Sequence, residues 1–142
     1  MKFLSPLITQ KLATPGEFVL FSDFRYEFEY GGRGFRAVVP RGFITDFASI
    51  PRVVQLLPGF GVNEDSAEAA VVHDWHYCCR GEIRVRDLQS GALVWLHLTR
   101  QECDALLLDG LVSSGYARAT ASLFYAGVRA GGWCYWNARS DG

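Results

Sequence analysis

Residues 24–30 alternate without a break between aromatic and charged side chains, and this pattern constrains the fold more than any other. The segment is Phe-Arg-Tyr-Glu-Phe-Glu-Tyr. Successive side chains of a β-strand point to opposite faces, so the alternation predicts a strand whose aromatic face is buried. A glycine-rich run at 31–34 and an apolar stretch at 35–39 follow. Together they predict an antiparallel hairpin over residues 24–39.

Shorter apolar runs flank this hairpin. Residues 17–22 and 42–47 are typical of further short strands. Pro51 suits the first turn of a brief helix that extends to about Leu57. The first half of the chain is therefore predicted to be mainly β.

The second half has mainly helical patterns. Ser66 is a candidate N-cap for a helix from Ala67 to about Cys79, which is apolar on both faces and should be buried. Residues 82–98 alternate, turn and return, which predicts an inserted hairpin. The capping box Thr99-Arg100-Gln101-Glu102 begins a helix to about Ser113, and residues 117–130 form a last helix.

The predicted fold class is α+β, with an N-terminal antiparallel hairpin or sheet packed against about three C-terminal helices. A length of 142 residues fits a single domain spanning 1–142, and 49% hydrophobic with 20% charged residues is typical of a globular protein. The aromatic end at 133–136 should pack on the body of the protein or on a partner chain.

Several classes of protein are disfavoured by composition. A net charge of −1 argues against nucleic-acid binding, which normally needs a basic face. Thr9, Gln10 and Lys11 interrupt the N-terminal apolar run before a signal peptide forms. No stretch reaches the roughly 18 apolar residues of a membrane span. The cysteines at 78, 79, 103 and 134 lack zinc-site spacing and are expected to be reduced.

His73 and Asp74 are the first candidates for chemistry. A polar pair on a buried helix is costly unless each side chain finds partners. Adjacent helix positions project about 100° apart, so the two need not contact each other. His73 could bind a metal or a proton, and Asp74 could cap backbone or orient a neighbour. The alternative is a core histidine hydrogen-bonded to a carbonyl.

Asp104 is expected to point inward. It shares a helix face with Leu107, Leu108 and Leu111, at i, i+3, i+4 and i+7. A buried aspartate should meet a cation, a metal or several donors. It could instead reach water at the edge of that face, or bind Thr99 or an arginine.

Asp46 lies in a polar loop sequence with Thr45 and Ser49 as supporting residues. Such residues at a strand end often bind backbone N–H groups. Alternatively, Asp46 could face the His73 helix as a ligand or base. One histidine with two or three carboxylates suits zinc, manganese or magnesium, and such an ion could activate water for hydrolysis.

The remaining histidines give weaker signals. His76 lies one turn after His73 and could share its face as a supporting ligand, although H-x-x-H lacks the zincin spacing. His97, in the inserted hairpin, is expected to be structural. The chain has no G-x-S-x-G elbow, P-loop or dinucleotide fingerprint. A cysteine nucleophile at Cys78 or Cys79 has little support.

Four sequence segments together resemble one known family. They are 39–52 (VPRGFITDFASIPR), 70–77 (AVVHDWHY), Asp104, and 125–132 (YAGVRAGG), which includes Arg129 as a supporting residue. In this order they resemble the domain-of-unknown-function family 1353, over residues 17 to 132. That family occurs mainly in tailed bacteriophages and prophages, which implies a phage-encoded protein made in the host bacterial cytoplasm. The stretch 80–98 is longer than the usual connection there.

Two functions are expected from these observations. The first is an accessory or virion (tail)-associated protein with a metal-dependent hydrolase-like site, acting on cell-wall peptide. Its catalytic residues would be Asp46, His73 and Asp74, and its metal ligands His73, Asp74 and Asp104. The alternative is a non-enzymatic tail or baseplate component in which these residues form a buried polar network. In either case, aromatic surfaces would contact other phage proteins.

Overall fold

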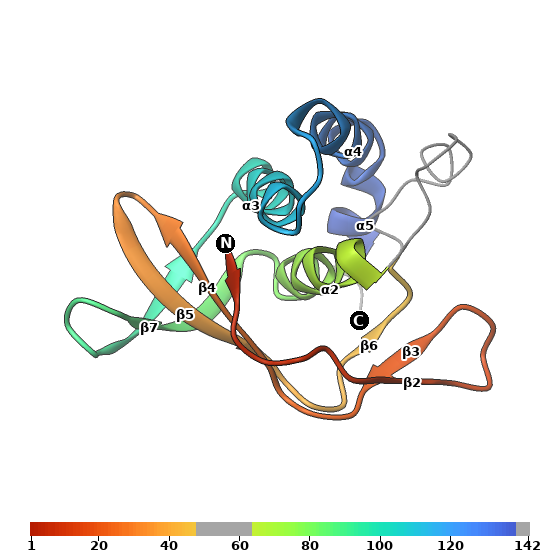
Figure 1. The fold of residues 1–142 in the computed structure, drawn as a ribbon, viewed down its shortest axis with the longest axis horizontal. Helices are drawn as coiled ribbons and strands as arrows, with labels where there is room; N and C mark the ends of the chain where they lie inside the picture. The colour runs from red at the N-terminus through yellow and green to blue at the C-terminus, as the bar shows by residue number, and fades with distance from the viewer. Residues whose placement is uncertain (48–63, 139–142) are drawn as a thin grey trace.

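The structure is a computed structural model that describes residues 1–47 and 64–138. An antiparallel sheet lies on one side of the molecule and a group of helices on the other (Figure 1). The larger sheet has the order β1-β4-β5-β7-β8, all antiparallel. Its strands are β1 (Lys2–Phe3), β4 (Phe24–Tyr30), β5 (Arg33–Val39), β7 (Glu82–Asp87) and β8 (Leu93–His97).

A smaller sheet of three short strands lies beside the larger one. It is formed by β2 (Thr9–Lys11), β3 (Phe18–Leu20) and β6 (Ile44–Thr45), in that order. Strand β6 ends where the polar loop sequence begins, so this sheet positions Thr45.

The described part of the chain contains four helices. They are α2 (Glu64–Cys78), α3 (Arg100–Ser113), α4 (Arg118–Gly131) and the short α5 (Trp133–Ala138). Helix α2 lies next to the sheet, α3 packs on α2, and α4 packs on α3 (Figure 1). None of these helices has the length and apolar character needed to cross a bilayer.

The two predicted hairpins are confirmed. Strands β4 and β5 pair from Phe24 with Val39 to Tyr30 with Arg33, around a two-residue turn at Gly31-Gly32. Both turn glycines have positive φ, 58° and 75°, a conformation that glycine adopts without steric cost. Strands β7 and β8 form the hairpin expected over 82–98.

The aromatic face of β4 lies inside the protein. Phe24, Tyr26 and Phe28 are buried in the core between the sheet and α2. The prediction that the aromatic face of this strand is buried is therefore confirmed. This aromatic face packs against the apolar side chains of α2.

Helix α2 joins two hydrophobic clusters. Val71 and Val72 belong to the cluster under the sheet, whereas Ala69 and Ala70 belong to the cluster with α3 and α4. The prediction that this helix is buried on both faces is therefore confirmed. Its start was predicted too late: α2 begins at Glu64, so Ser66 lies in the first turn, where it is buried, and is not the N-cap.

The α+β class is confirmed, with one helix more than the three expected among the described residues. The extra helix is α5, formed by the aromatic end of the chain. Trp136 packs edge-on against Tyr77 with ring centroids 5.1 Å apart, whereas Trp133 and Tyr135 are exposed. The brief helix predicted at 51–57 lies outside the described residues.

Candidate functional site

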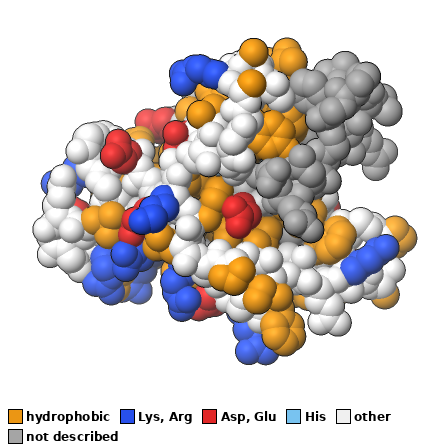
Figure 2. All heavy atoms as spheres, viewed as in Figure 1, with side chains coloured by type: hydrophobic (Ala, Val, Ile, Leu, Met, Phe, Trp, Pro, Cys, Tyr) orange, Lys and Arg blue, Asp and Glu red, His pale blue; other side chains and the backbone are white. Residues whose placement is uncertain are grey.

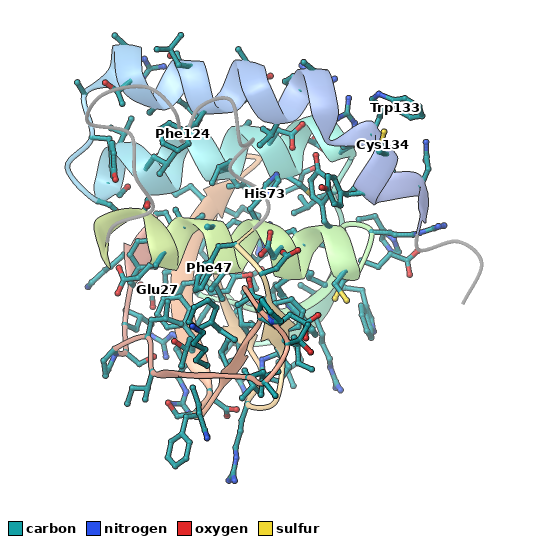
Figure 3. All side chains as sticks on the ribbon, turned by 90° about the vertical axis from the view of Figure 1, so that its right-hand side faces the viewer. Glu27, Phe47, His73, Phe124, Trp133 and Cys134 are labelled. Atoms are coloured by element: carbon teal, nitrogen blue, oxygen red, sulfur yellow. The ribbon has the colours of Figure 1, made fainter. Side chains whose placement is uncertain are left out.

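Three polar side chains of α2 contact three different elements. His73 contacts Asp104 of α3, Asp74 contacts Thr45 of β6, and His76 contacts Tyr26 of β4. Successive helix positions project about 100° apart, which explains the divergence. Figure 3 shows His73 on the α3 side of α2 and Phe47 on the opposite side. These side chains thus make separate contacts around one helix, and the catalytic and metal-binding roles predicted for His73 and Asp74 stay predictions.

Asp104 is the centre of a buried network. Its Oδ1 accepts hydrogen bonds from His73 Nε2 at 2.8 Å and from the Tyr77 hydroxyl at 2.5 Å. Its Oδ2 accepts one from Arg129 Nη1 at 2.9 Å, and Arg100 Nη1 lies 3.8 Å away. Asp104 is completely buried. These five residues are called the Asp104 network below.

The pKa shifts indicate an ionised aspartate beside a neutral histidine. Burial alone would raise the pKa of Asp104, but hydrogen bonds from His73, Tyr77 and Arg129 lower it below its usual value. Burial lowers the pKa of His73, and the adjacent carboxylate opposes that shift only partly. Burial and the bond to Asp104 raise the pKa of Tyr77, so its hydroxyl stays protonated.

These protonation states fix the tautomer of His73. An ionised Asp104 can only accept, so the ring proton lies on Nε2 and Nδ1 carries a lone pair. Among the described residues, this buried Nδ1 has no hydrogen-bond partner. A buried nitrogen of this kind costs about 1–3 kcal/mol compared with one exposed to water.

Tyr77 and Arg100 are network members that the sequence reasoning missed. Tyr77 lies four positions after the predicted residue His73 on α2, and Arg100 lies four positions before the predicted residue Asp104 on α3. Side chains at i and i+4 share a helix face, so this spacing was a readable signal. Gly132 lies close by, where an added Cβ would come within 2.6 Å of the Tyr77 hydroxyl.

Asp74 and Thr45 form a second contact, between α2 and β6. The Thr45 hydroxyl donates to Asp74 Oδ2 at 2.5 Å and accepts from the Phe47 backbone N–H at 3.1 Å. Thr45 is buried, and Phe47 has a positive φ of 51°. Asp46, between them in the chain, is exposed, unlike Asp104. The predicted supporting residue Ser49 lies outside the described residues.

His76 belongs to a third contact, on the sheet side of α2. Its Nε2 lies 2.7 Å from the hydroxyl of Tyr26, and both side chains are buried. Burial lowers the pKa of His76 to about 3, so the ring is neutral. His76 and His73 lie one turn apart on α2 but bind different partners, Tyr26 of β4 and Asp104 of α3.

A metal ion needs several donor side chains that converge on one point. The described residues contain no group of three or more His, Cys, Asp or Glu side chains placed to hold a metal ion. The Arg129 guanidinium lies 2.9 Å from Asp104 Oδ2, so its positive charge would repel a metal cation bound to that oxygen. Asp104 is therefore poorly suited to the predicted ligand role.

The profile of the family described as "Protein of unknown function (DUF1353)" matches residues 18–128, well over half of the chain. The chain belongs to the DUF1353 family. This DUF1353 segment runs from β3 into α4 and contains every member of the Asp104 network except Arg129, which follows it by one residue. Neither the curated proteins nor the solved structures contain a match to the chain.

Proposed function

We propose that this DUF1353 protein is a non-enzymatic structural component, in which the Asp104 network holds three helices together. The observation that carries the proposal is that side chains of α2 and α4 hold the buried carboxylate of Asp104. Both of its oxygens accept hydrogen bonds from side chains of the same chain, at 2.5 to 2.9 Å. These bonds take three of the about four acceptor sites of a carboxylate, and the guanidinium of Arg100 lies 3.8 Å from Oδ2 as well.

The partners of Asp104 come from separate elements, which explains the value of the network for folding. His73 and Tyr77 belong to α2, Asp104 to α3 and Arg129 to α4. Burying a charge without partners is costly. The carboxylate of Asp104 receives its hydrogen bonds only when α2, α3 and α4 pack in the arrangement seen here. The network therefore favours one packing of α2, α3 and α4 over alternatives.

The setting that we propose is a phage particle. The resemblance set out above is to a family met mainly in tailed phages and prophages, and a tail or baseplate is where a small structural protein of a tailed phage would act. The protein would then be made in the host bacterial cytoplasm and incorporated into the virion.

A second candidate function is the metal-dependent hydrolase acting on cell-wall peptide. One observation favours it: His73 Nδ1 is buried and has no hydrogen-bond partner among the described residues. A lone pair there could bind a zinc, manganese or magnesium ion or take a proton, with Asp104 orienting the ring from Nε2. Asp46 and Asp74 would have to move to supply the remaining carboxylates, because the described residues contain no group of three or more such side chains placed to hold a metal ion.

Substitution of His73 by alanine distinguishes the two functions. The structural proposal predicts that His73→Ala lowers the free energy of unfolding by about 2 to 4 kcal/mol, because it opens a cavity and removes a partner of Asp104. The matched control is His97→Ala, since the His97 side chain is 72% exposed. That control should stay within about 0.5 kcal/mol of the parent protein. Urea unfolding measures both.

Metal analysis and a peptidoglycan assay complete the experiment. The structural proposal predicts no stoichiometric zinc, manganese or magnesium, no change of thermal stability with EDTA and no cell-wall hydrolysis. A bound ion at one per chain that is lost in His73→Ala, with the stability of that variant unchanged, would contradict the proposal and support the hydrolase.

A further inference from the structure

We propose that two copies of this chain associate through β8, aligned antiparallel about a two-fold axis at Trp95 to make one continuous sheet. Strand β8 is the last strand of the larger sheet, and no described strand pairs with its outer edge. The inference does not depend on the role of the Asp104 network.

The outer edge of β8 offers a regular set of backbone groups. Leu98 N donates to Gly81 O, and Asp87 N donates to Ala92 O, so the even-numbered residues direct their backbone groups toward β7. In an antiparallel ladder the direction alternates along the strand. Leu93, Trp95 and His97 therefore direct their N–H and C=O groups toward the open edge.

The side chains of the same residues form an exposed apolar surface. Leu93 is 51% and Trp95 61% exposed, and Trp95 is the most exposed large apolar side chain of the described residues. Native edge strands are commonly protected by charged residues, by proline or by being short. Strand β8 is Leu-Val-Trp-Leu-His, without a carboxylate, lysine, arginine or proline. The opposite edge, β1, is only two residues long and includes Lys2.

The strand is complementary to itself in one register. With Trp95 opposite Trp95 of the second copy, Leu93 lies opposite His97 of that copy. Each of these residues directs its backbone groups outward, so each can exchange both hydrogen bonds with its counterpart. The two tryptophan rings would form a cross-strand aromatic pair.

The charges around β8 fit the same register. Glu82 is paired with His97 at one end of the hairpin, and Arg86 with Leu93 at the other. In the two-fold arrangement, one line of facing side chains runs across the joined sheets. It consists of Glu82 and His97 of one copy, followed by Leu93 and Arg86 of the second copy. Arg84 pairs with Trp95, so the two Trp95 side chains lie between Arg84 of one copy and Arg84 of the other. Figure 2 shows basic side chains gathered on the side where Figure 1 draws β5 and β7.

A second copy fits this edge better than an unrelated strand would. A two-fold axis aligns identical strands antiparallel, as in the rest of the sheet, and one substitution then acts on both sides of the interface. The self-paired register keeps the Arg84 residues of the two copies apart. An unrelated partner would leave the purified protein monomeric.

Charge substitutions at Trp95 test the pairing on the full chain. Sedimentation velocity over the micromolar to submillimolar range should show a dimer for the parent protein. Trp95→Lys and Trp95→Glu each place two like charges at the axis, and each should weaken dimerisation by at least about 30-fold. Mixing the two variants should restore the dimer, because a lysine then faces a glutamate.

The matched control is Leu123→Lys on α4, where Leu123 is 50% exposed and lies far along the chain from β8. This control should dimerise like the parent protein. Circular dichroism should show that every variant is folded, since Trp95 is largely exposed. A parent protein that stays monomeric, or a Trp95→Lys variant that dimerises as the parent does, would overturn the proposal. Failure of the mixed variants to associate would overturn the register.

Discussion

His73 and His76 of α2 are both neutral for the same physical reason, although they contact different partners. Burial lowers the pKa of each ring, for His76 to about 3. His73 donates a hydrogen bond from its Nε2–H to the ionised carboxylate of Asp104, whereas His76 Nε2 lies within hydrogen-bond distance of the Tyr26 hydroxyl. Each leaves a buried Nδ1 without a partner among the described residues. Protonating either ring would place a charge in the core.

We therefore predict that the protein loses stability in mild acid. Below pH about 6.5 the histidines of the unfolded chain bind protons, whereas His76 in the folded chain does so only near pH 3. The free energy of unfolding should fall as pH is lowered through this window, by up to about 1.4 kcal/mol per pH unit for each histidine. The lowered pKa of Asp104 adds a loss in the same direction at lower pH. Urea unfolding between about pH 8 and about pH 4.5 measures the slope.

Two substitutions check the source of this pH dependence. His76→Gln retains a polar group for Tyr26 but cannot titrate, so its slope should be shallower than that of the parent protein. The matched control is His97→Gln, since the His97 side chain is 72% exposed, and its free energy of unfolding at neutral pH should stay within about 0.5 kcal/mol of that of the parent protein. An unchanged slope in His76→Gln would show that the ring is not held neutral in the fold.

At the scale of elements, the connection from α2 to β7 depends on one glycine. Gly81 has a φ of +73°, and an added Cβ would lie 1.9 Å from the carbonyl oxygen of Leu98. The approach is close because Leu98 N donates to Gly81 O at 2.9 Å, directly after β8 ends. This bond continues the β7–β8 ladder up to the start of α3.

Gly81→Ala should therefore be strongly destabilising. The clash with Leu98 adds to the cost of a positive φ, and we expect a loss of more than about 3 kcal/mol in the free energy of unfolding. Gly91→Ala is the matched control: its φ is +72°, but nothing lies within 4 Å of an added Cβ. It should cost only about 1 to 2 kcal/mol. Equal losses in the two variants, measured by urea unfolding, would rule out the steric contact as the cause.

At the scale of the whole molecule, α2 links the sheet to the helices. It contributes residues to both hydrophobic clusters, and it makes the three polar contacts to β4, β6 and α3. Loosening α2 would expose apolar surface on both sides and leave buried polar groups unpaired. The sheet and the helices should therefore lose their structure together.

We predict a single cooperative unfolding transition. Trp75 packs on Phe43 on the sheet side, and Trp136 packs on Tyr77 on the helix side, so tryptophan fluorescence reports on both regions. Fluorescence and far-ultraviolet circular dichroism should give the same midpoint in urea. Separate midpoints would show that the two regions unfold independently and would argue against a single domain.

Local patterns predicted the elements because their signals lie within a few residues. The alternation of 24–30 predicted β4, and the Thr99 to Glu102 capping box is present with both of its reciprocal bonds. The spacing of Asp104 from Leu107 and Leu111 predicted that its carboxylate points inward, and it is completely buried. The i, i+4 pairs that add Tyr77 and Arg100 were also available in the sequence.

The sequence by itself determined the α+β class, the two hairpins, the buried character of α2 and the inward direction of Asp104, because these follow from periodicity and capping. Only the tertiary structure decided the partners: His73 and Arg129 meet Asp104 across 31 and 25 positions of the chain, and Asp74 meets Thr45 across 29. It also left β8 at the edge of the larger sheet. The physical reason is that periodicity specifies which face of an element is buried, whereas packing among all the elements selects what that face contacts.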